Sequence, residues 1–141
     1  MQIGIAEFLE KVGKLRHTKE KVDALKANDS FALRVILQGA FDPTVKFLLP
    51  EGIPPYKPNN LVDQEHILIN EARKLQYFVD GFHELTPSKR EMMFIEFLER
   101  VAPKDAELLC AIKEKKLHCK GITIQHVKEA LPGLINEQIQ A

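Results

Sequence analysis

The sequence of 141 residues is poor in the features that define several large protein classes. Its only two cysteines, Cys110 and Cys119, are too few for a disulfide framework and favour free thiols in a reducing compartment. No run approaches the roughly 18 apolar residues that a membrane-spanning helix needs, and the first residues lack the basic and apolar regions of a secretory signal. We therefore expect a cytoplasmic protein that has no membrane partner.

The spacings that carry common catalytic and metal chemistries are also missing. The seven glycines are scattered, so the sequence has no phosphate-binding loop, no dinucleotide-binding pattern and no nucleophile elbow. Four side chains, Cys110, His118, Cys119 and His126, form neither a Cys-x-x-Cys pair nor a His-x-x-x-His pair, so we expect no zinc site. The glutamates of residues 84–99 are typical of a solvated helix face. We predict that the protein is not an enzyme and needs no cofactor.

Length and composition fit one globular domain. Hydrophobic residues make up 45% of the chain and charged residues 28%, which is ordinary for a folded protein. A chain of this length usually forms a single core. Apolar residues recur at helical spacing, and no convincing alternating strand pattern occurs. The expected fold is all-α: a compact single-domain bundle of about seven helices over residues 1–141, joined by short connections.

Capping residues, glycines and prolines mark the expected helix boundaries. The first helix places apolar side chains on one face and ends near Gly13; these side chains are Ile5, Phe8, Leu9 and Val12. A short turn is predicted at Asp42-Pro43, where proline follows a capping aspartate. The other helices are predicted to begin near Thr18, Asn28-Asp29, Glu65, Thr86-Pro87, Pro103 and Thr123.

A proline-rich segment interrupts the helical pattern. Residues 50–60 contain four of the eight prolines, and proline sustains neither a helix nor a central strand. The segment lacks the arginine-flanked repeat of an SH3 ligand. We therefore expect an extended internal loop that serves as a spacer within the domain.

Positive charge is local, because twenty basic and twenty acidic residues cancel over the whole chain. Residues 11–26 contain six basic side chains against two acidic ones, and residues 113–120 contain four lysines against one glutamate. Residues 51–100 run the other way, with nine acids against six bases. Any contact with nucleic-acid phosphates should therefore use the two ends of the chain.

The segment from residue 115 to residue 123 has the outline of a phosphate site. Gly121 would let the backbone approach a ligand closely, and the helix that starts after Thr123 would offer unpaired N–H groups and a positive dipole end. Lysines in the same segment would add positive charge; they are Lys115, Lys116 and Lys120. The alternative interpretation is an ordinary connection between two helices, with a turn glycine and solvated lysines.

Several short motifs occur in a fixed order from Phe8 almost to the C-terminus. The N-terminal group comprises Thr18-Lys19-x-Lys21, Leu25, Asn28 and Leu33-Arg34-Val35. The C-terminal group comprises Asp105-x-Glu107-Leu108-Leu109, Leu117-x-Cys119, Gly121, Thr123-Ile124, Pro132-Gly133-Leu134-Ile135 and Glu137-Gln138. In the order and spacing of these motifs, the chain resembles the N-terminal DNA-binding domain of the ATP-dependent DNA ligases of T-even bacteriophages.

The resemblance implies an all-helical module that lies along the minor groove of duplex DNA and holds phosphates on both sides of a nick. In the family domain the two ends of the module meet. The implied phosphate-binding face therefore joins two N-terminal lysines to the C-terminal segment; its members are Lys19, Lys21, Lys115, Lys116, Lys120, Gly121 and Thr123. The loop of residues 119–123 and the middle of the chain depart from the family pattern.

The same resemblance implies that ligation itself is absent. Ligases use the lysine of a Lys-x-Asp-Gly motif as nucleophile. The only Asp-Gly pair here is Asp80-Gly81, and Phe78 occupies the lysine position. We therefore expect a freestanding, non-catalytic accessory protein of a phage, located in the host cytoplasm. Its expected partners are nicked or intact duplex DNA and replication or repair proteins such as a sliding clamp. The alternative is a protein-interaction or host-takeover factor that does not bind DNA, which the zero net charge favours.

Overall fold

The computed structural model describes residues 3–61, 63–81 and 84–135. Within these ranges the chain forms seven α-helices and one 3₁₀ helix, and its only strand-like pairing is an isolated bridge between Phe47 and Val79. The all-α bundle expected from the sequence is therefore confirmed. Its elements are α1 (Ile5–Gly13), α2 (Thr18–Ala27), α3 (Phe31–Phe41), α4 (His66–Glu71), η1 (Ala72–Phe78), α5 (Pro87–Arg100), α6 (Pro103–Ile112) and α7 (Ile124–Ala130).

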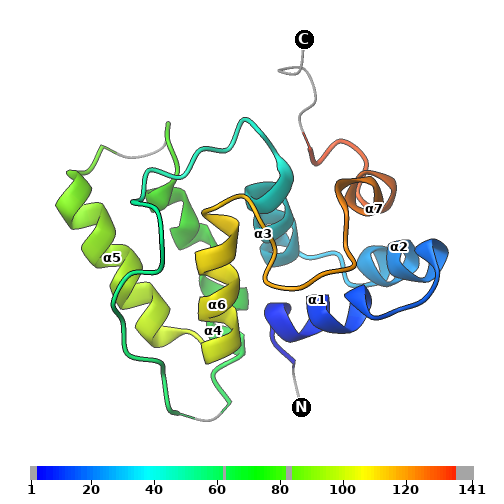
Figure 1. The fold of residues 1–141 in the computed structure, drawn as a ribbon, viewed down its shortest axis with the longest axis horizontal. Coiled ribbons are helices and arrows are strands. Elements are labelled where there is room, and N and C mark those ends of the chain that lie inside the picture. Colours follow the sequence, from blue (N-terminus) through cyan, green and yellow to red (C-terminus); the bar gives the residue numbers. More distant parts are fainter. Residues whose placement is uncertain (1–2, 62, 82–83, 136–141) are drawn as a thin grey trace.

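Helices from the two ends of the chain pack side by side. Helix α2 contacts α7, while α1 contacts both α2 and α6 (Figure 1). Helices α3 and α6 lie in the middle of the molecule, and α5 covers α6 on the side away from α7 (Figure 1). This arrangement brings the two positively charged segments of the sequence to the same side of the bundle.

The core is built from the apolar helix faces that the periodicity marked. Phe78 of η1 meets Phe94 of α5 edge to face, with ring centroids 5.1 Å apart. Aliphatic side chains from six helices complete the fully buried centre; they are Leu9, Leu25, Leu33, Ile36, Leu37, Leu68, Leu98, Leu108, Leu109 and Ile112. Burying these side chains is the main source of stability for a helical domain of this size.

Most predicted helix starts are found where the capping residues stand. Thr86 accepts a hydrogen bond from Lys89 N at 3.2 Å, with Pro87 as the first helical residue of α5. Pro103 begins α6, and Thr123 is the N-cap of α7. Helix α2 differs by one position, because Thr18 is its first helical residue and His17 stands at the N-cap.

Two connecting segments are held by polar contacts rather than by helical structure. The turn at Asp42 stays short, because the Asp42 carboxylate accepts hydrogen bonds from the Thr44 backbone and hydroxyl. Residues 50–61 contain no helix or strand and run along α5, as the prolines predicted (Figure 1). In this loop Asn59 Nδ2 donates to Arg100 O at 2.7 Å and satisfies a carbonyl at the C-terminal end of α5.

No helix in the described ranges is long and apolar enough to cross a membrane. Glu137 and Gln138, which belong to the last motif of the ligase resemblance, lie outside the described residues.

Candidate nucleic-acid interface

The segment between α6 and α7, residues 113–123, crosses the molecule beside α1 (Figure 1). We call this segment the strap. His118 anchors its middle, since Nε2 donates to Ala6 O at 2.9 Å and lies 3.4 Å from the Glu10 carboxylate. Its end lies against the last residue of α1, Gly13. The strap therefore follows α1 along its length and then reaches α2 and α7.

Gly121 is required by a close approach of two backbone segments. A Cβ atom at Gly121 would lie 2.2 Å from Gly13 O, and one at Gly13 would lie 2.3 Å from Lys120 O. Gly121 also has a φ of +100°, which disfavours residues with a side chain. The sequence predicted that this glycine admits a phosphate; in the structure the group that it admits is the backbone of α1.

Lys21 links the two ends of the chain directly. Its ammonium group donates to Gly121 O at 2.5 Å, across a separation of 100 residues. The predicted meeting of the N-terminal and C-terminal segments therefore occurs at this contact. Lys19 does not share it, because residues two positions apart on a helix project about 200° from one another around the axis. Lys19 is exposed on the other side of α2.

Lys115 turns its charge into the protein. With a φ of +62° it ends the hydrogen bonding of α6 in the position that glycine often takes. Its three ammonium donors point at three carbonyls near the end of α3, those of Gly39 at 2.6 Å, Asp42 at 2.7 Å and Val45 at 2.9 Å. Burial of the ammonium group lowers the pKa of Lys115. A lysine with all three donors in use has none left for a phosphate.

Thr123 is occupied by helix capping. Its backbone N–H donates to His126 Nδ1 at 3.0 Å, in the reciprocal pattern of a capping box. Helix α7 has only seven residues, so its dipole offers little to a ligand. The sequence correctly indicated a cap at this position, but the N–H group that we expected to be open is satisfied within the chain.

Two of the predicted residues, Lys116 and Lys120, remain exposed on the strap. Because Gly13 abuts Lys120, the exposed Lys14 and Arg16 that follow α1 lie beside the end of the strap. None of these four side chains forms an ion pair or hydrogen bond within the described residues. We call the three residues at the end of the strap, Lys14, Arg16 and Lys120, together with Lys116 four residues earlier on the strap, the corner surface. The predicted site omitted Lys14 and Arg16, although both lie in the positive N-terminal segment.

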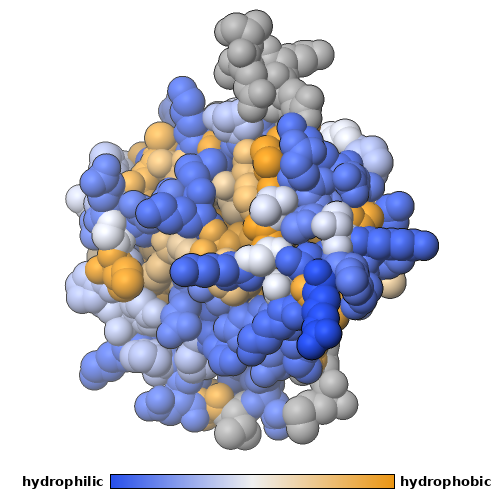
Figure 2. Space-filling view, turned by 45° about the vertical axis from the view of Figure 1, so that its right-hand side comes forward, coloured by the Kyte–Doolittle hydropathy of each residue, from blue (hydrophilic) through white to orange (hydrophobic). Residues whose placement is uncertain are grey.

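The acidic group beside the strap is already neutralised. Glu10 lies 3.1 Å from Lys104 Nζ, and this hydrogen bond lowers the pKa of the Glu10 carboxyl. His118 approaches the other carboxylate oxygen of the same residue. Hydrophilic side chains cover the right-hand part of Figure 2, the side on which α1, α2 and α7 lie. The corner surface therefore has local positive charge in a protein with no net charge.

Other chemistry is sparse in the described ranges. No three His, Cys, Asp or Glu side chains come together there in a way that would hold a metal ion. Cys110 is buried and Cys119 half-buried, both as free thiols, and burial raises the pKa of each. Raised pKa values leave little thiolate at neutral pH, which disfavours a nucleophilic role.

Residues 8–119 of the chain match a family of unknown function, DUF6433, and the protein belongs to that family. The match begins within α1 and ends inside the strap, so it includes Lys14, Arg16 and Lys116 but not Lys120. No curated protein matches the sequence. The similarity to the DNA-binding domain of phage ligases stays a prediction.

Proposed function

We propose that the protein binds duplex DNA through the corner surface and has no catalytic activity of its own. One observation carries the proposal: the contacts of the strap with Lys21 and Gly13 join two positively charged segments that are 100 residues apart in the sequence. Exposed cations without partners can neutralise DNA phosphates and release the counterions bound there. Lys116 and Lys120 are available for such phosphate contacts, whereas the three ammonium donors of Lys115 are already bonded to backbone carbonyls.

Binding of this kind should tolerate any sequence. Lysine and arginine contacts to phosphates position a protein on the duplex but do not read the bases. The ligase resemblance supports the same partner and adds a preference to be tested, since the ligase domain holds nicked DNA. The proposed biological role is that of a phage accessory protein in the host cytoplasm, which marks DNA for replication or repair proteins such as a sliding clamp.

The proposal of a non-catalytic protein rests on the segment that would correspond to the adenylation motif. Phe78 stands at the lysine position, and its ring is 1% exposed and packed against Phe94. A side chain in the core cannot attack a nucleotide. The adjoining Asp80-Gly81 pair is therefore interpreted as an ordinary turn after η1.

The test is a fluorescence anisotropy titration of intact and nicked duplexes at several salt concentrations. The variant combines Lys14→Ala, Lys116→Ala and Lys120→Ala. Each lost phosphate contact should reduce the slope of log K against log salt by about 0.9, so the variant should lose roughly 2 to 3 units of slope. A matched control removes the same charge elsewhere, from the exposed residues Lys57, Lys74 and Lys89.

The proposal holds if the corner variant binds every duplex more weakly with a reduced slope, while the control variant binds as the parent does. It fails if the parent binds no duplex at low salt, or if both variants lose affinity equally. Absence of binding by the parent would favour the alternative function, a protein-interaction factor that uses the helical scaffold without touching DNA. Equal losses by the two variants would mean that the corner surface is not the DNA site.

A further inference from the structure

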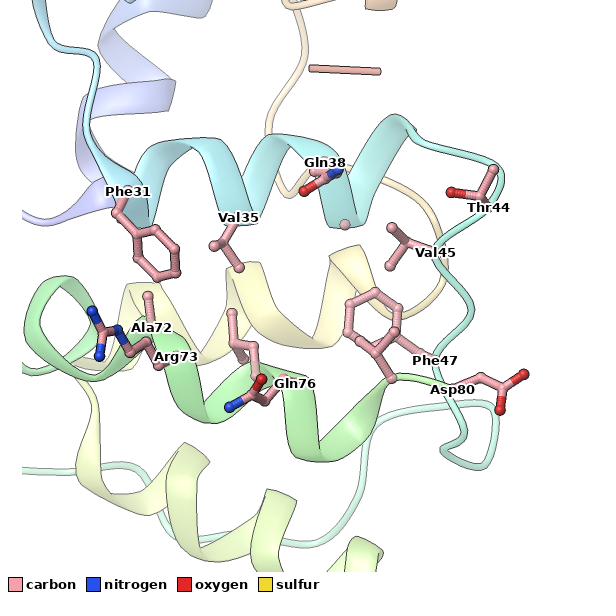
Figure 3. Close-up of a pocket in the computed structure, with 13 residues that line it drawn as sticks. Phe31, Val35, Gln38, Thr44, Val45, Phe47, Ala72, Arg73, Gln76 and Asp80 are labelled. Carbon is pink, nitrogen blue, oxygen red and sulfur yellow. The ribbon is translucent and has the colours of Figure 1, made fainter. Parts of the chain in front are cut away.

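A hollow of about 570 Å³ lies between α3 and η1. Lys115 of the strap borders one end of it, because its ammonium group donates to Gly39 O and Val45 O and lies 5.9 Å from the centre of the Phe47 ring. Figure 3 shows the two helices on either side of the hollow, with side chains from both pointing into the space between them. Its lining is mostly apolar, and Phe31 at one end is 57% exposed. A large apolar side chain exposed beside an apolar hollow is a common mark of a binding site. The apolar lining consists of Phe31, Val35, Val45, Phe47, Ala72, Leu75 and Val79.

The hollow is a trough that runs along the helix axes. Phe31, Val35 and Gly39 lie at i, i+4 and i+8 on α3, so they form one stripe on the α3 side of the hollow. Eight residues of α-helix span about 12 Å, which is the length of the stripe. Three apolar side chains at i, i+3 or i+4, and i+7 of another helix span about 10 Å. One face of a short amphipathic helix therefore matches the trough in length.

Opposite charges stand at the two ends. Arg73 lies with its guanidinium group 5.8 Å from the centre of the Phe31 ring, and Asp80 lies at the far end beyond Phe47 (Figure 3). Neither charge forms an ion pair within the part of the chain that the structure describes. Gln76 lines the trough between them. The trough thus offers an apolar lining with Arg73 at one end and Asp80 at the other, where the ammonium group of Lys115 is already bonded to backbone carbonyls.

We infer that this trough binds an amphipathic helix of a partner protein, with an acidic residue facing Arg73 and a basic residue facing Asp80. Grooves of this kind hold helices through apolar side chains spaced at i, i+3 or i+4, and i+7. Because each exposed ion pair contributes little affinity, the apolar contacts supply most of the binding and the charges set the orientation. No residue of the corner surface lines the trough.

The probe is a fluorescein-labelled, alanine-based peptide of about 14 residues, a length at which helices begin to form in water. It carries three leucines on one helix face, with glutamate before the first and lysine after the last. A second peptide of the same composition distributes the leucines around the helix. By anisotropy, the patterned peptide should bind at least about tenfold more tightly than the scrambled one, a difference of roughly 1.4 kcal/mol.

Variants locate the binding. Val35→Glu puts a charge in the apolar lining of the trough and should weaken binding of the patterned peptide more than about tenfold. Phe31→Ala, at an exposed position, should weaken it about threefold or more without a risk to folding. Met92→Ala on α5, 62% exposed and outside the trough, is the control and should bind as the parent does. Circular dichroism melts verify that each variant is folded.

Charge exchange tests the orientation. Arg73→Glu should shift the preference by about two- to fivefold from the glutamate–lysine peptide to one with lysine at both ends. Equal binding of patterned and scrambled peptides by the parent would overturn the inference, as would unchanged binding by both Val35→Glu and Phe31→Ala. Binding of anilinonaphthalene sulfonate in the trough but of neither peptide would also overturn it and identify a small-molecule site.

Discussion

Replacing Asp105 by asparagine should change how the stability of the protein depends on pH. Asp105 lies in the first turn of α6 and is 1% exposed. One carboxylate oxygen accepts a hydrogen bond from Ala6 N at 3.0 Å and so caps the start of α1, while the other has no partner among the described residues. Burial, together with the nearby charges of Glu65 and Glu7, raises its pKa from an ordinary 3.8 to about 6, although the hydrogen bond from Ala6 N acts in the opposite direction.

The sign and size of the effect follow from that pKa. The folded protein holds the proton more tightly than the unfolded chain, so the protonated group stabilises the fold fully below about pH 4. This stabilisation is lost as the pH rises through about 6. The difference between the two pKa values corresponds to roughly 3 kcal/mol, because each pKa unit is worth about 1.4 kcal/mol.

Asparagine has the shape of aspartic acid and keeps an oxygen for Ala6 N, but it does not ionise. Burying the amide N–H₂ of asparagine costs stability, but this cost is the same at every pH. The test therefore uses the difference in free energy of unfolding between parent and variant, and asks how that difference changes with pH. Relative to the parent, Asp105→Asn should gain roughly 3 kcal/mol in free energy of unfolding between about pH 4 and pH 7.5.

The assay is urea denaturation at several pH values, followed by far-ultraviolet circular dichroism. Glu10 and Glu71 have lowered pKa values, so their contributions are lost at low pH, but they are shared by parent and variant and cancel in the difference. Glu107→Gln, an exposed change on the same helix, is the control. A difference between parent and Asp105→Asn that does not vary with pH would refute the reasoning.

Three further predictions concern the strap and the core. Gly121→Ala should cost more than about 2 kcal/mol of stability, whereas Gly133→Ala, also at positive φ but with open space for a Cβ, should cost about 1 kcal/mol; equal costs would contradict the backbone contact. Lys115→Met should lower the free energy of unfolding by about 1 to 3 kcal/mol and leave the salt slope of DNA binding unchanged. Lys116→Met should leave the free energy of unfolding unchanged and reduce the salt slope. Incubation with ATP and magnesium should leave the mass unchanged, because Phe78 occupies the lysine position; an added adenylate in the mass spectrum would show ligase-type chemistry.

Local signals in the sequence were sufficient for most of the fold. Helix periodicity and caps act over three or four residues, so the starts of α5 and α6 could be predicted from Thr86-Pro87 and Pro103. The change from α4 to the 3₁₀ geometry of η1 at Ala72 was not predicted. Tightening of this kind depends on how a segment packs against its neighbours, and a single sequence carries no direct record of that packing.

The candidate site was harder to predict because its contacts join distant parts of the chain. The lysine and glycine content of residues 115–123 is the same whether those residues bind phosphate or bind the rest of the protein. The partners of Lys115 lie 70 to 76 residues away, and the partner of Gly121 lies at the end of α1. Composition can mark such a segment, but only the fold shows which donors are already used.

Counting the donors in use changes the DNA hypothesis in a specific way. The ammonium groups of Lys21 and Lys115 donate hydrogen bonds to backbone carbonyls of the chain, and the backbone of Gly121 lies in close contact with that of Gly13. These residues build the corner and cannot also be its phosphate ligands without breaking the contacts that shape it. The positive charge that remains available comes from the exposed residues around them. Substitutions in the first group should therefore lower stability, and substitutions in the corner surface should lower DNA affinity at unchanged stability, which separates the two roles experimentally.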